Sequence, residues 1–234
     1  MKFSAFGLSC LAAVFLSSCA SVSVTDEKRT SGKGVCKPAK IYIAEFGTSQ
    51  AAVKIAGSEA KDPEKFKKKI AGLLHNYTLK CVSEHVAPTQ SAAGAQGLPK
   101  SGWLVTGEFV RINTGSRLLR AGVGLGAGGS KMETRVSVYD LALGTTQPFL
   151  TFETTGGSNA MPGLLESSGP GSAVISMTTQ SMMGVTDDAA RTSRMIAGEL
   201  NCYMVGCHWL GKDKQYSVKK LGQYQLVHEQ YYHP

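Results

Sequence analysis

Residues 132–139 read Met132-Glu133-Thr134-Arg135-Val136-Ser137-Val138-Tyr139, and this stretch decides the fold. Met, Thr, Val and Val occupy the even positions, whereas Glu, Arg, Ser and Tyr occupy the odd ones. Successive side chains of a β-strand point to opposite faces of a sheet, so a period of two predicts a half-buried strand. We therefore expect a sheet that packs one face against other elements.

Further strands are predicted before and after this stretch. Residues 103–112 are rich in β-forming residues, and the short apolar run 41–46 is stopped by Gly47. Turn residues lie between 140 and 148, and residues 149–155 then return as another strand. The strands at 132–139 and 149–155, with turn residues between them, are therefore predicted to form a hairpin. Hairpin strands run antiparallel.

Two amphipathic helices accompany the strands. Asp62-Pro63-Glu64 combines a side-chain acceptor, a proline and an acid, which is typical of a helix start. The apolar residues that follow at helical spacing are Phe66, Ile70, Leu73, Leu74 and Tyr77. A second helix is predicted to begin at Thr186-Asp187-Asp188 and to end near Gly206. The predicted fold class is α+β: a single domain with a mixed, mainly antiparallel sheet and two packed helices.

The N-terminal segment has the features of an export signal. Lys2 precedes an apolar run that is too short to cross a bilayer as a helix. The tetrapeptide Leu16-Ser17-Ser18-Cys19 then resembles the lipobox of bacterial lipoproteins. In that class the cysteine is modified with diacylglycerol, becomes the first residue after cleavage, and is acylated, for example with palmitate. The resemblance implies a lipoprotein signal peptide at 1–18 and lipid attachment at Cys19.

The residue after Cys19 bears on the location. In lipoproteins an Asp at this place favours retention in the inner membrane, whereas this chain has Ala20. We therefore expect a lipid anchor in the outer membrane, with the domain facing the periplasm. The alternative is an ordinary signal peptide in which the cysteine is incidental.

The rest of the chain divides into three parts. Residues 19–37 are polar and mixed in charge, which predicts a flexible tether; residues 38–210 hold the α+β periplasmic domain, and 211–234 form a basic, tyrosine-rich tail. The formal net charge falls from +8 to +7 when Lys2 leaves with the signal peptide. No basic motif with interleaved aromatic residues occurs, so we expect no nucleic-acid partner.

Four cysteines remain after the lipobox: Cys36, Cys81, Cys202 and Cys207. An exported compartment permits disulfides, and four thiols allow three pairings, which the sequence leaves open. Cys202, Cys207 and His208 lie close together in the sequence and could be taken for zinc ligands. The second pair of ligands that a zinc site requires is missing, so no metal site is predicted.

A glycine-rich connection runs from Gly115 to Gly129 between two predicted strands. Part of it fits the dinucleotide pattern G-x-G-x-x-G, but a strand follows in place of the helix that this fingerprint requires, so no cofactor is predicted. Closely spaced glycines let backbones approach each other, and arginines hold anions, so the connection is a candidate interaction segment. The alternative is a flexible connection with exposed arginines. The candidate residues are Arg117, Arg120, Gly122, Gly124, Gly126 and Gly128.

The chain contains Gly115-Ser116-Arg117, then Arg120, then Gly124-Leu125-Gly126-Ala127-Gly128, and then a strand that ends Val138-Tyr139-Asp140. This pattern resembles an uncharacterised family of bacterial envelope lipoproteins, a domain of unknown function, from the strand at 41 to the helix ending near 203. That family has no assigned activity and no catalytic residues. The order of elements is more distantly similar to the periplasmic domain of the curli secretion channel lipoprotein, in which inserted segments form membrane hairpins.

Three functions follow as hypotheses. The first is a non-catalytic lipoprotein that binds envelope proteins or its own copies through the glycine-rich connection and residues 156–185. The second is a component of an oligomeric, curli-type export channel, which needs membrane-inserted segments of about 9–11 residues. The third is an envelope enzyme. No histidine lies beside a serine or cysteine in a recognised motif, so we predict no enzyme activity and no catalytic residue.

Overall fold

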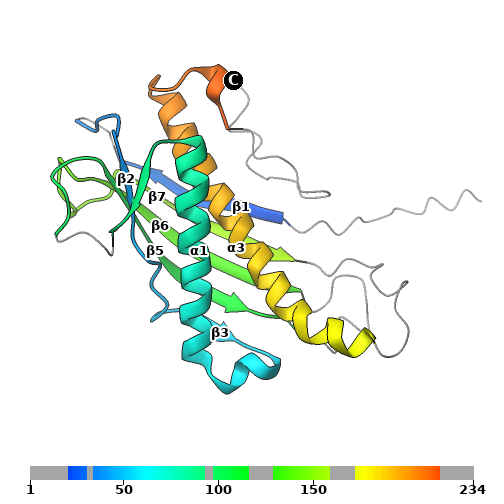
Figure 1. Ribbon diagram of the computed structural model, residues 1–234. Helices are drawn as coiled ribbons and strands as arrows, with labels where there is room; N and C mark the ends of the chain where they lie inside the picture. Colours follow the sequence, from blue (N-terminus) through cyan, green and yellow to red (C-terminus); the bar gives the residue numbers. More distant parts are fainter. Residues whose placement is uncertain (1–20, 31–33, 93–96, 116–128, 159–171, 217–234) are drawn as a thin grey trace, which may run out of the picture.

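The computed structural model describes residues 21–30, 34–92, 97–115, 129–158 and 172–216, which form a seven-stranded mixed sheet and two long helices (Figure 1). Along the sheet the order is β1-β7-β6-β5-β2-β4, and β3 pairs with β5 off this path. The predicted α+β class is confirmed. The strands are β1 (Ser21–Arg29), β2 (Ile41–Ile43), β3 (Ala52–Lys54), β4 (Thr89–Ser91), β5 (Trp103–Asn113), β6 (Ser130–Asp140) and β7 (Leu150–Ser158).

The long strands are antiparallel and the short ones are parallel. β1 pairs antiparallel with β7, β7 with β6, and β6 with β5. β2 pairs parallel with both β4 and β5, and β3 pairs parallel with β5. Parallel neighbours need a crossover connection, and the helix α1 supplies it between β2 and β4.

The helices α1 (Pro63–His85) and α3 (Ser172–Gly206) pack against each other and cover one face of the sheet (Figure 1). α1 begins where predicted, because the side chain of Asp62 accepts a hydrogen bond from the N–H of Lys65 (3.0 Å). Phe66, Ile70 and Leu74 of the predicted apolar stripe are buried. Two short 3-10 helices, η1 (Gly57–Lys61) and η3 (Lys212–Lys214), lie before α1 and after α3.

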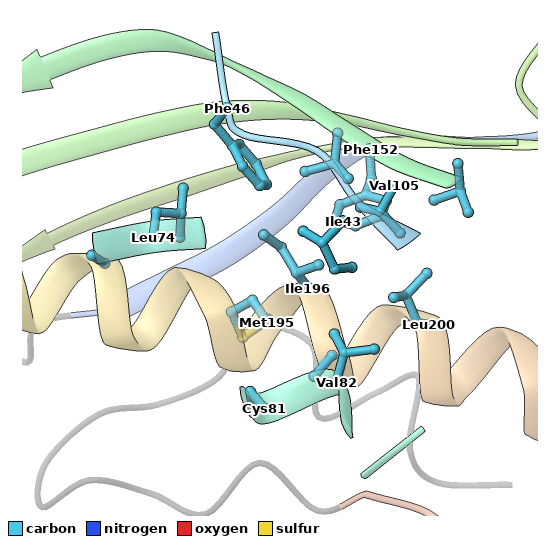
Figure 2. Packing of buried hydrophobic residues seen from close by; sticks show 14 of the residues in the cluster. Ile43, Phe46, Leu74, Cys81, Val82, Val105, Phe152, Met195, Ile196 and Leu200 are labelled. Atoms are coloured by element: carbon cyan, nitrogen blue, oxygen red, sulfur yellow. The ribbon is translucent and has the colours of Figure 1, made fainter. Parts of the chain in front are cut away.

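The hydrophobic core lies between the helices and the sheet. The even-numbered apolar residues of β6, Met132, Val136 and Val138, have no exposed surface, as the period of two predicts. Figure 2 shows side chains from both helices and from the strands meeting in this core, among them Leu74 of α1 and Ile196 of α3. The sheet therefore buries one face against α1 and α3.

The segment after Cys19 differs from the prediction. Residues 21–29, expected within the flexible tether 19–37, form β1 and pair along β7. Val24 is 8% exposed and packs against the core. Only a few apolar residues mark this edge strand among serines and charged residues, so its composition indicated a tether.

The helix α3 also differs from the prediction. It begins at Ser172 and not at Thr186, so residues 156–185 contain the end of β7 and the first turns of α3. Residues 159–171 lie outside the described residues. Over the described ranges, no helix combines the length and apolar character that crossing a membrane requires.

Candidate functional site at one end of the sheet

Four strand ends meet at one end of the sheet. β1 begins at Ser21, β6 begins at Ser130, β5 ends at Asn113 and β7 ends at Ser158, and the strand registers bring these ends together (Figure 1). We call this the anchor end, because Ser21 follows closely after Cys19, the predicted site of lipid attachment. The glycine-rich connection between β5 and β6, and the connection between β7 and α3, both leave the sheet here.

Hydrogen bonds hold the start of the glycine-rich connection. The buried Thr114 donates its N–H to the carbonyl of Lys54 (3.0 Å), and its hydroxyl oxygen accepts from the N–H of Ala56 (2.8 Å). Gly115 has a φ of +77° and donates its N–H to the side-chain oxygen of Asn113 (2.9 Å). Glycine adopts this left-handed conformation at little cost. The chain therefore leaves β5 along a path set by contacts with the residues of β3 and those that follow it.

A buried polar cluster holds the other end of the connection. The hydroxyl of Ser130 donates to Asp188 Oδ2 on α3 (2.6 Å), and Arg191 Nη1 donates to Asp188 Oδ1 (2.9 Å). Burial raises the pKa of Asp188 to about 6, although the hydrogen bond from Ser130 and the charge of Arg191 oppose the shift. Asp188 thus joins the first residue of β6 to α3.

A second charged cluster joins β1 to α3. The guanidinium of Arg29 contacts Glu27 on its own strand and lies 3.5 Å from Glu199 Oε1 on α3. The side chain of Glu199 has no exposed surface, and Arg29 also lies 5.5 Å from the ring centroid of Tyr203. Burial lowers the pKa of Arg29, but the hydrogen bond to Glu27 and the charges of Glu27 and Glu199 outweigh it and raise the pKa. β1 is therefore attached to the helix layer as well as to β7.

The sheet face away from the helices carries balanced charges. Arg135 of β6 pairs with Glu153 of β7 (2.7 Å), and Glu133 pairs with Lys131 (2.7 Å) and Arg111 (3.4 Å). The residues of β6 in these pairs are odd-numbered, as the alternation predicts. Each pair is open to water and contributes about 0–1 kcal/mol to stability. This face is a solvated polar surface.

A pocket of about 920 Å³ lies at the end of the molecule opposite the anchor end. Its wall includes Cys81 and His85 of α1, Arg194 of α3, and Tyr216. The ring of Tyr216 stacks on His85 (3.8 Å between centroids), and its hydroxyl lies 3.8 Å from Cys81 Sγ. Burial raises the pKa of the Cys81 thiol, which disfavours the reactive thiolate. The geometry does not activate this cysteine as a nucleophile.

The structure brings together one serine and one histidine that the sequence did not indicate. His75 Nε2 lies 3.1 Å from Ser91 Oγ, and His75 Nδ1 lies 3.3 Å from the carbonyl oxygen of Ala44. A nucleophile beside a base that a third group orients is the arrangement of many hydrolases. The pair belongs to α1 and β4, so no local motif could have revealed it. Neither residue lines the pocket described above, and the contacts join α1 to β4 and to Ala44, the residue after β2.

Most of the predicted site residues lie outside the described residues. These are Cys19 and the glycine-rich candidates Arg117, Arg120, Gly122, Gly124, Gly126 and Gly128. The predicted tail is described only as far as residue 216. No grouping of three or more His, Cys, Asp or Glu side chains that could hold a metal ion occurs in the part of the chain that the structure describes.

The other four predicted site residues, the cysteines at 36, 81, 202 and 207, are described. No disulfide joins any two of them. Cys36 is exposed, Cys81 is buried, and Cys202 and Cys207 are half-buried. The four thiols therefore lie in different environments.

Residues 41–190 match the family described as Domain of unknown function (DUF4410), which is more than half of the chain. The chain belongs to this family. The DUF4410 match runs from β2 into α3 and spans the whole glycine-rich connection and the contact between Ser130 and Asp188. The predicted resemblance to a family of unknown function is confirmed to this extent. A search of curated proteins finds no match to this chain.

Three solved structures are similar to this DUF4410 protein at low identity. The PelC dodecamer from Paraburkholderia phytofirmans is 9% identical with a TM-score of 0.34, over 73% of this chain and 96% of that chain. A variant of the same dodecamer is 12% identical with a TM-score of 0.34, over 70% and 97%. A Xanthomonas campestris protein of the family DUF330 is 9% identical with a TM-score of 0.38, over 74% and 91%. At these values the likeness carries no conclusion about function or assembly.

Proposed function

We propose that this protein is a non-catalytic lipoprotein, anchored in the outer membrane through Cys19, that acts in the assembly of envelope proteins. One observation carries the proposal: β1 begins at Ser21, and both long connections leave the sheet at this same end. An acylated Cys19 would hold the anchor end at the membrane surface, because two or three acyl chains give stable attachment. The opposite end, with the pocket, would face the periplasm.

The glycine-rich connection is the proposed contact segment. Its two ends are held by Thr114 and by the bond between Ser130 and Asp188. Fixed ends reduce the conformational entropy that a segment loses when it binds a partner. Arg117 and Arg120 offer planar cationic groups to acidic side chains on an envelope protein or on a second copy of the chain.

The anchoring is tested by mass and by fractionation. Mature protein extracted from envelopes should begin at an acylated Cys19, and Cys19→Ala should lose the acyl mass and leave the outer-membrane fraction. Cys36→Ala is the matched control and should stay in that fraction. A mature chain without acyl groups would refute the lipid anchor.

The contact segment is tested by crosslinking and pull-down from intact envelopes. The double variant Arg117→Ala/Arg120→Ala should reduce the yield of crosslinked partners several-fold, as should replacement of residues 122–129. Arg111→Ala/Arg135→Ala removes two arginines from the open sheet face and should leave the yield unchanged. Equal yields from all these variants would remove the glycine-rich connection from the proposed function.

The non-catalytic part of the proposal is tested at His75 and Ser91. Hydrolysis of a p-nitrophenyl ester by wild type and by Ser91→Ala should be equally slow. A folded Ser91→Ala variant that loses a measurable turnover would identify an enzyme.

The position of the two connections also favours a second candidate, a component of an oligomeric export channel. The described residues on both sides of 116–128 and of 159–171 lie at the anchor end, and each interval is long enough for one membrane-inserted strand of roughly 9–11 residues. Electron microscopy of detergent extracts distinguishes the candidates: rings support the channel, and a strict monomer excludes it.

A further inference from the structure

The backbone of Cys36 is held on both sides by buried residues. Its N–H donates to Asp140 Oδ2 (2.9 Å), and its carbonyl oxygen accepts from Trp103 Nε1 (3.0 Å). Cys36 is exposed, and its thiol donates to the carbonyl oxygen of Gly34 (3.5 Å). Cys36 therefore combines a fixed backbone with a thiol that a second protein can reach.

Cys207 reaches the same place from the end of α3. Its backbone N–H donates to the carbonyl oxygen of Tyr203 (3.0 Å), and its thiol lies near the hydroxyl of that tyrosine. The ring of Tyr203 packs on Trp103 (5.7 Å between centroids), and the ring of Trp209 lies 6.0 Å from Trp103. Residues on both sides of Cys207 thus contact the tryptophan that binds the carbonyl of Cys36.

Two further contacts link the neighbourhoods of the two cysteines. Lys37 Nζ donates to the carbonyl oxygen of Trp209 (2.9 Å). Burial and the Cys207 thiol raise the pKa of Tyr203 to about 12, and the charge of Asp140, which holds Cys36, adds to this shift. The segments 35–37 and 207–209 therefore lie together against one aromatic cluster.

The other two cysteines face different surroundings. Cys202 lies near Arg29 of β1, and Cys81 lies 3.8 Å from the hydroxyl of Tyr216 in the pocket. Of the pairings that the sequence leaves open, the contacts favour Cys36 with Cys207.

We propose that Cys36 and Cys207 are a redox pair that a protein disulfide donor of the exported compartment converts to a disulfide. This inference rests on the proposed function only in its assumption of export. The Cys36 thiolate attacks one sulfur of the donor disulfide, which forms a mixed disulfide and releases the other donor sulfur as a thiolate. The Cys207 thiolate then attacks the Cys36 sulfur and expels the second donor sulfur. The chain loses two protons and two electrons, and the donor gains them as a dithiol.

The bond would join the N-terminal segment to the end of α3. It would constrain the unfolded chain over most of its length, and a disulfide that closes a long loop stabilises the folded protein. In this way the redox state would set how firmly residues 34–40, which lead into β2, are held.

The experiment maps disulfides in the full-length protein, extracted in detergent and treated with oxidised glutathione. Trypsin places Cys36 in peptide 34–40 and both Cys202 and Cys207 in peptide 195–212. The expected result is a crosslinked pair of these peptides whose fragment ions assign the bond to Cys207. Absence of the pair, or fragment ions that assign the bond to Cys202, would overturn the proposal.

Thermal unfolding with and without reductant provides a second readout. Reductant should lower the melting temperature of the oxidised wild type by roughly 5–15 °C, and should leave Cys36→Ser and Cys207→Ser unchanged. Cys81→Ala is the control and should keep the shift. A shift that persists in Cys36→Ser would contradict the pairing.

Alkylation of free thiols in intact cells separates this proposal from the proposed function. A bond that forms in the purified protein and also in cells supports both. A bond that forms in the purified protein but is absent in cells supports the pairing and contradicts the exported location.

Discussion

Single polar residues connect elements that are far apart in the sequence. Ser130 and Asp188 are 58 positions apart and form a hydrogen bond of 2.6 Å. The fully buried Asn201 donates to the carbonyl oxygens of His85 and Lys214. A buried polar group that loses its partner costs about 1–3 kcal/mol, so each of these residues favours one arrangement of its neighbours.

The titration of Asp188 gives a prediction at the residue scale. The pKa of Asp188 is about 6 in the folded protein, whereas the ordinary value for a solvent-exposed aspartate is 3.8. The folded chain therefore binds the proton more tightly than the unfolded chain does. The contribution of Asp188 to the free energy of unfolding should therefore rise by about 2–3 kcal/mol as the pH falls from 7 to 4. Urea unfolding of wild type and of Asp188→Asn at several pH values measures this contribution. The difference between the two proteins removes the effect of the other carboxylates, which both share. A difference between the two proteins that is independent of pH would contradict the assignment.

The close approach of β5 to Phe46 gives a second residue-scale prediction. A Cβ at Gly107 would lie 2.1 Å from Phe46 Cε1, and Phe46 is buried in the core. Gly107→Ala should lower the free energy of unfolding by about 2–3 kcal/mol, because the ring has no free space to enter. Phe46→Leu in that background should recover part of the loss.

A helical glycine provides the control for Gly107. A Cβ at Gly72 on α1 meets no atom within 4 Å, so Gly72→Ala should stabilise the protein by about 0.5–1 kcal/mol through helix propensity. Urea unfolding of both variants settles the comparison. Similar losses at both glycines would show that contact with Phe46 is not the cause.

At the scale of elements, β1 is the strand that connects the predicted lipid anchor to the sheet. It is an edge strand, and among the described strands its ladder of backbone hydrogen bonds is with β7, with a register shift between Thr25 and Lys28. Arg29 adds the contact with the buried Glu199. Edge strands are more easily opened than central ones, so this side-chain contact contributes to holding the strand in place.

Removal of that contact is the prediction at the element scale. Arg29→Ala should lower the free energy of unfolding by about 1–2 kcal/mol, because Glu199 is buried while Arg29 is partly exposed. Hydrogen exchange should accelerate in β1 more than in β5 or β6. Arg135→Ala, on the open face, should change stability by less than about 0.5 kcal/mol. Unchanged exchange in β1 would show that β7 alone holds the strand.

At the scale of the whole molecule, the two ends of the sheet differ. The anchor end carries the start of β1 and both long connections, whereas the opposite end carries the pocket and the cluster of Cys36, Trp103 and Cys207. A chain attached at Cys19 would present these ends to different surroundings. The fold therefore places the proposed contact region and the proposed redox site at opposite ends of the sheet.

The short stretch of sequence between Cys19, the predicted site of lipid attachment, and the start of β1 at Ser21 gives the whole-molecule prediction. A Gly/Ser spacer of about 20 residues between Ala20 and Ser21 would behave as a flexible coil and move the anchor end tens of ångströms from the membrane. Acylation and folding should be unchanged, while crosslinks to membrane-attached partners should fall several-fold. Crosslink yields equal to those of the wild type would mean that position at the membrane does not matter.

Features that depend on residues close together in the sequence were predicted correctly, whereas features that depend on distant residues were not. The strand at 132–139 and the start of α1 at Asp62 were predicted correctly, because alternation and helix capping depend on neighbouring residues. β1 was wrongly predicted as part of a tether, because its place at the sheet edge depends on pairing with β7, more than 120 positions away. α3 starts earlier than predicted, because residues 172–185 are rich in Ser, Thr and Met and show no clear apolar periodicity.

The features of the candidate site also divide into those that depend on local sequence and those that depend on tertiary contacts. The sequence by itself determined the alternation that divides the sheet into a buried and a polar face, the helix start at Asp62 and the resemblance to a lipobox, because each is a local pattern. Only the tertiary structure decided that β1 starts beside the glycine-rich connection, that Ser130 meets Asp188, and that Cys36 and Cys207 share one aromatic cluster. These contacts depend on strand register and on the helix crossover, which bring together residues that no local spacing relates.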